Sequence, residues 1–222
     1  MKLSIIVPAL NEAAGIGATL ASLASLRARG HEVIVADGGS ADATREIATP
    51  LADRVIGAPR GRARQMNAGA AAASGDALLF LHADTRLPAD ADLLILDSLR
   101  ENSWGRFDVA IEGRSTLLPL IAFLMNLRSR LSGIATGDQA IFARRDAFPG
   151  FPEIALMEDV AFSKAMKRRS PPACLRQKAV TSGRRWEERG PWRTMLLMWR
   201  LRLEYFLGAA PYELARRYAK KA

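Results

Sequence analysis

The segment ALLFLHADTRLP, residues 77–88, decides how the rest of the chain is interpreted. Five apolar residues, 77–81, run without interruption into His82, Ala83 and Asp84, and Pro88 opens a new segment. A strand that is apolar on both faces is typical of a parallel sheet covered by helices on both sides. We therefore predict a buried strand that ends in a carboxylate, Asp84.

Strands and helices alternate on the N-terminal side of this segment. Apolar runs predict further strands over residues 3–7, 32–36 and 54–56. Residues 13–28 have the apolar spacing of one helix, residues 61–73 form another, and Ser40 is a candidate N-cap for a third. This alternation predicts an α/β fold with right-handed crossovers and a mostly parallel sheet.

The pattern changes beyond residue 90. Residues 107–111 alternate apolar and polar side chains, which fits an antiparallel strand or a strand with one exposed face. We expect helices over residues 117–127 and 160–167, and a strand over residues 139–143. One domain over residues 1–190, followed by an amphipathic, basic helical tail over residues 191–222, is the simplest organisation.

The composition is that of a soluble globular protein, with 49% hydrophobic residues in a chain of 222. The longest apolar run, residues 117–125, is far shorter than the roughly 18 residues that a membrane-spanning helix needs. Residues 1–12 lead directly into a strand and lack the cleavage pattern of a signal peptide. A single cysteine, Cys174, excludes an internal disulfide and is typical of a small buried side chain. We therefore expect a protein of the reducing cytoplasm.

Basic residues are concentrated near the C-terminus. Residues 164–222 carry 16 of the 32 Lys and Arg residues but only 4 of the 23 acidic ones. Such an excess fits an anionic partner, which includes a diphosphate, an acidic lipid and a nucleic acid. A solvated basic surface without a partner fits the same pattern.

Polar residues follow three of the predicted strands. These are the loops Pro8–Glu12, Asp37–Ser40 and His82–Asp84. Each taken alone fits an ordinary turn. Because ligands of open α/β sheets bind at the carboxyl ends of parallel strands, the three loops together predict one binding crevice.

Four segments carry a family resemblance. SIIVPALNEAAGI (4–16), EVIVADGGSADAT (32–44), GRARQMNAGAAAASGDALLFLHADT (61–85) and LMEDVAFSKAMKRR (156–169) resemble family-2 glycosyltransferases of the GT-A fold. The similarity is strongest to a short bacterial branch described as radical-SAM/selenodomain-associated transferases. It implies a nucleotide-diphosphate-sugar donor, expected to be a UDP-sugar, a divalent cation (Mg²⁺ or Mn²⁺) and inversion at the anomeric carbon. It also implies a nucleotide-binding half over residues 1–90 and an acceptor half over residues 91–190.

The resemblance assigns roles to individual residues. Asp37 matches the aspartate that accepts a hydrogen bond from the base of the donor. Pro8, Ala9 and Glu12 match the loop that lines the nucleoside of the donor. Arg62 and Arg64 stand where family members have a basic residue near the base or the diphosphate. Asp84 matches the last acid of the Asp-x-Asp metal motif. Glu158 and Asp159 match the Glu-Asp pair, with Asp159 as catalytic base and Glu158 on the acceptor side.

Elementary chemistry agrees with two of these roles. A departing diphosphate gains negative charge, which a hard cation held by one carboxylate neutralises without a proton. An acceptor hydroxyl becomes a good nucleophile only when a base takes its proton, and one carboxylate suffices for that. The alternative for Glu158 and Asp159 is an acidic first helical turn favoured by the helix dipole.

The sequence departs from the family pattern at two places. His82 replaces the first acid of Asp-x-Asp, so it either binds the donor or is a structural histidine. Ser182 stands where processive members have the Gln of Gln-x-x-Arg-Trp, which argues against processivity. Arg184, Arg185 and Trp186 either close over the donor or form a basic loop with one packed tryptophan. Asp138 and Gln139 are further candidates for acceptor contact.

Other functions find less support. A nucleotidyltransferase would have a glycine-rich loop and a lysine after the first strand, and a dehydrogenase would have a third glycine near Gly15 and Gly17. A non-catalytic module that binds acidic lipid or nucleic acid has no zinc-finger or RNA-binding signature to support it, and we expect no nucleic-acid partner.

The predicted helix over residues 192–206 suggests contact with a membrane. It gathers six apolar side chains on one face beside three arginines: Trp192, Met195, Leu196, Trp199, Leu203 and Phe206, with Arg193, Arg200 and Arg202. This pattern predicts peripheral attachment to the anionic cytoplasmic leaflet and a lipid-like acceptor. The alternative is a helix that covers the core of its own domain or a dimer partner.

Overall fold

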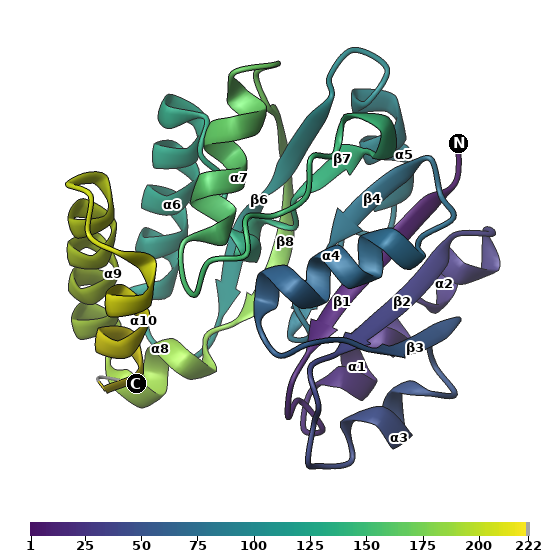
Figure 1. Ribbon diagram of the computed structural model, residues 1–222, viewed down its shortest axis with the longest axis horizontal. Coiled ribbons are helices and arrows are strands. Elements are labelled where there is room, and N and C mark those ends of the chain that lie inside the picture. Colours follow the sequence, from purple (N-terminus) through teal and green to yellow (C-terminus); the bar gives the residue numbers. More distant parts are fainter. Residues whose placement is uncertain (221–222) are drawn as a thin grey trace.

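One mixed sheet of eight strands, in the order β3-β2-β1-β4-β7-β6-β8-β5, organises the molecule (Figure 1). The computed structural model describes residues 1–220, and within them the side chains of residues 185, 219 and 220 lie outside the description. Helices cover both faces of this sheet. The expected α/β architecture is therefore confirmed.

The parallel half of the sheet is built from the predicted apolar runs. Its strands are β1 (Leu3–Ala9), β2 (Glu32–Asp37), β3 (Arg54–Gly57) and β4 (Ala77–Phe80). In the parallel register, Ala9 lies beside Asp37 and Ile6 beside Phe80, so these strands end at one edge. Strand β4 is buried along its whole length, as its apolar sequence predicted.

Alternate residues of β1 face different helices. One face packs on α1 (Ile16–Ser22), α2 (Ala24–Ala28), α3 (Thr44–Ala48) and α5 (Ala91–Ser98). The other face packs on α4 (Arg62–Ala72) and α7 (Glu158–Lys167), which lie in front of the sheet in Figure 1. Burial on both sides explains why β1, β2 and β4 are almost entirely apolar.

Two local predictions in this half were wrong. The helix expected over residues 13–28 is divided at Leu23, and its first residues form turns before α1 begins. Ser40 does not cap a helix, because its hydroxyl accepts a hydrogen bond from the backbone N–H of Asn11 (2.9 Å). Helix α3 begins later, at Thr44, after a turn in which Asp42 accepts hydrogen bonds from Thr44.

The second half of the sheet is mixed. It contains β5 (Thr85–Arg86), β6 (Trp104–Glu112), β7 (Phe142–Arg144) and β8 (Ala173–Ser182), with α6 (Leu118–Ser132) packed on β6. The strand expected over residues 107–111 is present, but the antiparallel pairing offered for it is wrong. These residues pair in parallel with β8, and β6 is antiparallel to β7 only at Trp104 and Gly105. The strand expected over residues 139–143 begins only at Phe142, because residues 137–139 form the 3₁₀ turn η1 (Gly137–Gln139). A second 3₁₀ turn, η2 (Arg145–Ala147), follows β7.

Three helices end the described chain. They are α8 (Arg184–Arg189), α9 (Pro191–Phe206) and α10 (Pro211–Lys220), and they lie beside α6 in Figure 1. Helix α9 packs inward through Thr194, Met195 and Leu201. Of the six apolar residues predicted to share one face, only Met195 is buried, and the other five are more than half exposed. Helix α9 therefore does contact the domain's own core, as the alternative expected, but through residues other than most of the predicted apolar face.

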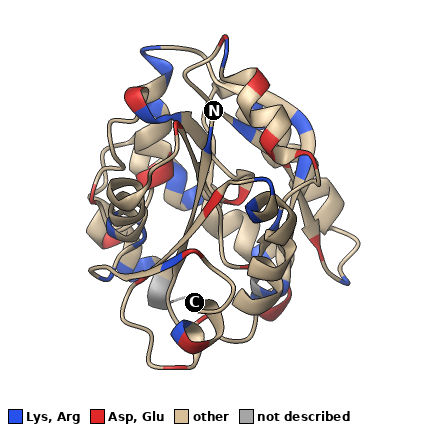
Figure 2. Ribbon diagram, turned by 90° about the vertical axis from the view of Figure 1, so that its right-hand side faces the viewer, with Lys and Arg blue, Asp and Glu red and all other residues tan. Residues whose placement is uncertain are grey.

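Charge and hydropathy complete the description of the surface. Basic and acidic residues are interspersed along the ribbon on the side of the molecule that carries α2 and α3 (Figure 2). No helix within residues 1–220 is both long enough and apolar enough to cross a bilayer.

Candidate functional site

A cavity of about 440 Å³ lies at the carboxyl ends of β1 and β4. The beginning of α7, the turn η1 and parts of α8, α9 and α10 complete its walls. Of the residues predicted to form the site, the following line it: Pro8, Glu12, Arg62, His82, Asp84, Asp138, Glu158, Asp159 and Trp186. The crevice expected from three loops is therefore present at the loops after β1 and β4, whereas the loop Asp37–Ser40 after β2 does not line it.

Asp84 enters this cavity from the end of β4. Its carboxylate Oδ1 accepts hydrogen bonds from the hydroxyls of Thr85 (3.4 Å) and Thr181 (3.5 Å). Those two threonines face each other where β5 pairs with β8, and their hydroxyls are 3.1 Å apart. Asp84 thus follows a strand of the parallel half of the sheet, and threonines of β5 and β8 in the mixed half hold its carboxylate in place.

Asp159 enters the same cavity from the first turn of α7. Its Oδ2 accepts a hydrogen bond from the backbone N–H of Gly137 (3.0 Å), and its Oδ1 accepts one from the N–H of Val160 (2.7 Å). Met157, which precedes α7, has the left-handed φ of 70° that is uncommon for a residue with a side chain. Such strain is often found at functional sites, where surrounding packing maintains it.

Glu158 is the buried member of the acidic pair, with 5% of its surface exposed. Burial raises the pKa of its carboxyl, and the neighbouring charge of Asp159 raises it further. Arg62, at the head of α4, acts in the opposite direction from 3.8 Å. The site therefore contains one buried carboxyl with a raised pKa, Glu158, beside a second carboxyl, Asp159, that lines the cavity and accepts two backbone hydrogen bonds.

The turn η1 connects His82 with Asp159. Nδ1 of His82 lies 3.2 Å from Oδ1 of Asp138, and the imidazole ring packs against Gly137. A Cβ atom at position 137 would overlap the His82 ring, so only glycine fits this turn as it stands. Nε2 of His82 is buried and has no hydrogen-bond partner among the described residues. This histidine therefore supports the loop that holds Asp159 and keeps one nitrogen unsatisfied.

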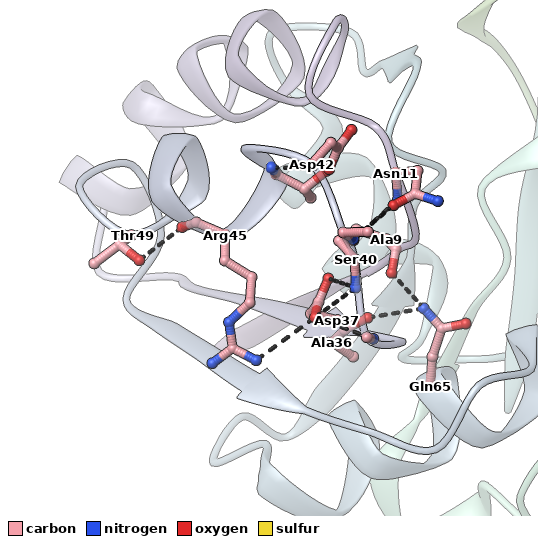
Figure 3. A network of polar contacts seen from close by, with 12 residues as sticks. Ala9, Asn11, Ala36, Asp37, Ser40, Asp42, Arg45, Thr49 and Gln65 are labelled. Carbon is pink, nitrogen blue, oxygen red and sulfur yellow. Dashed lines mark hydrogen bonds and ion pairs between the residues drawn. The ribbon is translucent and has the colours of Figure 1, made fainter.

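Asp37 belongs to a separate network beside the cavity (Figure 3). Its fully buried carboxylate accepts hydrogen bonds from the N–H groups of Gly39 (3.1 Å) and Ser40 (3.2 Å), and Arg45 lies 3.5 Å away. Gln65 donates to the carbonyls of Ala9 (2.7 Å) and Ala36 (3.0 Å), which ties the ends of β1 and β2 together. A ligand reaches Asp37 only if the carboxylate gives up part of these contacts.

Other predicted residues lie outside the cavity lining. Arg64 is paired with Glu153 at 3.1 Å, and Arg184 lies 3.7 Å from Glu12 at the edge of the site. Gln139 is fully buried, where its amide accepts from the Thr136 N–H in a capping box, so the structure does not bring it to the cavity. Ala9 does not line the cavity. The side chain of Arg185 lies outside the described part of the structure.

The structure adds cavity residues that sequence reasoning missed. Arg202 of α9 and Tyr218 of α10 line the cavity, as do Thr136 and Thr181. Burial lowers the pKa of Arg202, although the charges of Asp159 and Asp138 oppose that effect. The available signal for Arg202 was its place between Leu201 and Leu203 in an amphipathic helix. No comparable signal marked Tyr218.

The side chains of the site fit a hard cation, such as Mg²⁺, that the protein alone would hold weakly. Within residues 1–220, no group of three or more His, Cys, Asp or Glu side chains is arranged to hold a metal ion. Mg²⁺ needs only one or two protein carboxylates when phosphate oxygens and waters complete its shell. Asp84, half-buried and open to the cavity, is suited to be that carboxylate.

Relatives of the chain are glycosyltransferases. A "PGL/p-HBAD biosynthesis glycosyltransferase" of Mycobacterium tuberculosis is 41% identical over 98 residues, which cover 41% of this chain and 38% of that protein. The chain thus matches less than half the length of this curated relative. The same degree of similarity is found to proteins of the same name from Mycobacterium bovis.

Solved structures with the same fold include Staphylococcus aureus TarS in complex with UDP-GlcNAc, with 21% identity and a TM-score of 0.66 over 82% of this chain and 58% of that one. They also include glucosyl-3-phosphoglycerate synthase from M. tuberculosis in complex with Mn²⁺, UDP and glucosyl-3-phosphoglycerate, with 22% identity and a TM-score of 0.61 over 81% and 71% of the two chains. These similarities confirm the expected GT-A fold. The model of "Glycosyl transferase family 2" matches residues 4–145, and the chain belongs to this family.

Proposed function

We propose that this chain transfers a sugar from a nucleotide-diphosphate donor, expected to be a UDP-sugar, to an acceptor hydroxyl with inversion. The observation that carries the proposal is that Asp84 and Asp159, from distant parts of the sequence, line one cavity. The TarS complex with UDP-GlcNAc and the synthase complex with Mn²⁺ and UDP support the choice of donor. The branch of the family suggested by the sequence stays a prediction.

The donor would enter along the carboxyl ends of β1 and β4. Pro8 and Glu12 line that end of the cavity, and Arg62 offers a guanidinium to the diphosphate. A divalent cation, Mg²⁺ or Mn²⁺, held by Asp84 would neutralise the charge that develops on the departing diphosphate. Asp37 and Ala9 would support the nucleobase of the donor by shaping the neighbouring loops. Arg64 and the segment Arg184–Trp186 would support the donor from the rim of the site.

Asp159 is positioned to act as the base. Its two backbone hydrogen bonds fix the position of its carboxylate in the lining of the cavity. As the acceptor oxygen attacks the anomeric carbon, its proton passes to Asp159, while the bond from that carbon to the diphosphate breaks. The nucleotide leaves as an anion, so the chain needs no separate general acid. Glu158 and Asp138 would contact the acceptor from either side of this base.

Two variants test the proposal. Asp159→Asn should retain UDP affinity in the presence of Mn²⁺, yet reduce transfer by roughly 10²–10⁴-fold, because the hydroxyl loses its base. Asp84→Ala should remove the Mn²⁺-dependent part of UDP binding. Calorimetry with UDP and Mn²⁺ measures binding, and UDP release from a panel of UDP-sugars measures turnover.

An exposed acid on α5, Asp97, provides the control. Asp97→Asn should bind UDP and turn over like the parent chain. Full transfer activity in Asp159→Asn would reassign the base. UDP binding that is equally tight with and without Mn²⁺ would remove the metal from the proposal.

A further inference from the structure

A second cavity, of about 560 Å³, lies between α6 and α9. Its walls are mostly apolar, with Ile121 and Leu124 from α6 opposite Met195 and Trp199 from α9. We call this space the α6–α9 groove. A volume of this size with apolar walls suits hydrocarbon better than a nucleotide.

The α6–α9 groove is continuous with the candidate site. Asp138, Trp186, Met198 and Arg202 line both cavities. A molecule that occupies the groove can therefore extend one end toward Asp159 without leaving the protein. That continuity relates the groove to the acceptor, because the donor is expected at the opposite end of the site, near β1.

Two arginines stand in the walls of the groove. Nε and Nη2 of Arg128 and Nε of Arg202 are buried and have no hydrogen-bond partner among the described residues. Burial, followed by the charge of Arg202, lowers the pKa of Arg128 to about 10. Buried donors without partners are uncommon in folded proteins, and paired guanidiniums are well suited to phosphate. The arrangement therefore indicates an anionic group close to the apolar walls.

The rim of the groove is an exposed apolar surface. It includes Leu127 (41% exposed) and Leu131 (80%) of α6, and Trp199 (52%) and Leu203 (60%) of α9. Large exposed apolar patches mark interaction sites. Because residues 164–222 carry 16 basic and only 4 acidic residues, this surface fits the anionic face of a membrane.

We propose that the α6–α9 groove binds the apolar chain of an anionic membrane lipid whose phosphate contacts Arg128 and Arg202. The head group beyond the phosphate carries the hydroxyl that reaches Asp159. This inference rests on the proposed function, since it names the acceptor class of the same site. The exposed rim lies on the membrane surface and brings the groove to the lipid.

Vesicles of defined composition test the lipid. Phosphatidylcholine vesicles are prepared alone, or with phosphatidylglycerol, phosphatidic acid or diacylglycerol. Phosphatidylglycerol supplies chain, phosphate and hydroxyl, whereas phosphatidic acid has no head-group hydroxyl and diacylglycerol has no phosphate. The chain should float with both anionic vesicles, and UDP release from UDP-sugars should rise at least tenfold only with phosphatidylglycerol. Equal flotation with all four vesicles, or with none, would overturn the proposal.

Matched variants test the groove. Leu131→Glu and Leu203→Glu should reduce flotation at least tenfold, whereas Leu93→Glu, at a 66% exposed position on α5, should not. Arg128→Gln should weaken binding to anionic vesicles and leave the small affinity for neutral ones unchanged. If Leu93→Glu loses flotation equally, the groove is not the docking surface.

UDP affinity separates the two proposals. Leu131→Glu and Leu203→Glu should bind UDP with Mn²⁺ as tightly as the parent chain. UDP binding without flotation would overturn the lipid inference alone, while loss of UDP binding in the parent chain would overturn the proposed function. Light scattering adds an independent outcome, since a dimer that Leu131→Glu converts to monomer would assign this surface to a second copy.

Discussion

The chain has two histidines, His31 and His82, and each contacts an aspartate in a different environment. His31 lies at the start of β2, where its Nδ1 accepts the N–H of Leu3 (3.2 Å) and its Nε2 lies 2.9 Å from Asp92. Arg29 also binds Asp92. Every polar atom of that imidazole is therefore satisfied, and both side chains are nearly buried.

The pair of His82 and Asp138 is more exposed and less completely hydrogen-bonded than the pair of His31 and Asp92. Asp138 is 39% exposed, and Nε2 of His82 has no partner among the described residues. The His31–Asp92 pair thus joins α5 to the beginnings of β1 and β2, at the end of these strands away from the cavity. The His82–Asp138 pair lies in the cavity lining. The comparison teaches that a satisfied pair is expected to contribute stability, whereas an incompletely satisfied pair at a cavity is expected to contribute to function.

Of the variants that test this comparison, Gly137→Ala is expected to have the largest effect on sugar transfer, because residue 137 packs against the His82 ring. The new Cβ would overlap the His82 ring, so the ring or η1 must shift, and we expect the N–H of Gly137 to move away from Asp159. Displacement of a base by about 1 Å costs on the order of 100-fold in rate. Transfer should fall by at least that factor in a sugar-transfer assay.

Gly15→Ala is the matched control. Its Cβ would lie 3.8 Å from the carbonyl of Ala83, which is an ordinary contact. Transfer should be nearly unchanged in this variant. A similar loss in both variants would show that the site tolerates no change in its loops, and the specific link between Gly137 and Asp159 would be lost.

The next effect is on stability and comes from Asp92→Asn. Hydrogen bonds from Arg29 and His31 outweigh burial and lower the pKa of Asp92 from 3.8 to about 2. Because the folded pKa lies below the unfolded one, this stabilisation is present above pH ~4 and is lost as the pH falls toward 2. The variant should lose about 2 kcal/mol of unfolding free energy at neutral pH, since one pKa unit corresponds to about 1.4 kcal/mol.

Urea unfolding at several pH values measures this prediction. The parent chain should lose stability more steeply than Asp92→Asn as the pH falls from about 4 toward 2. UDP affinity should be unchanged in the variant. Identical pH profiles for the two chains would show that the His31–Asp92 pair stabilises the fold less than its burial suggests.

The parallel half of the fold was predictable because its signals are local. Uninterrupted apolar runs marked β1, β2 and β4, and the parallel arrangement then placed Pro8 and Asp84 at one edge of the sheet. Ser40 was assigned wrongly because its hydroxyl is used by Asn11, which no local pattern reveals. Gln139 has the polarity of a binding residue but fills a buried capping box.

The second half depended on contacts between distant segments. Asp84 is held by Thr181 of β8, and Asp159 by Gly137, and neither pairing follows from periodicity. The helix over residues 192–206 was predicted correctly as an element, but the sequence left its orientation open, because the amphipathic pattern alone does not say which face is covered.

A smaller effect is expected from Asp138→Asn. The substitution removes the carboxylate from His82 but leaves a polar side chain that is 39% exposed, so stability should change by less than about 0.5 kcal/mol. Transfer should fall on the order of tenfold, as is typical when a supporting hydrogen-bond partner is lost. Unfolding and transfer assays on the same preparation measure both values. If stability falls as it does in Asp92→Asn, the two pairs have the same role and the comparison fails.

The smallest effect, and the opposite pH dependence, is expected from Glu158→Gln. Burial and then the charge of Asp159 raise the pKa of Glu158, although Arg62 opposes them. The folded state therefore binds this proton more tightly than the unfolded state, and the contribution of Glu158 to stability increases as the pH falls through its raised pKa. Glutamine is neutral at every pH, so the variant should be at least as stable as the parent at neutral pH, with a change within about 1 kcal/mol. Urea unfolding at neutral and acidic pH measures the difference, which should shrink on acidification. A variant that is much less stable at neutral pH would show that the ion pair with Arg62 outweighs the burial of the charge.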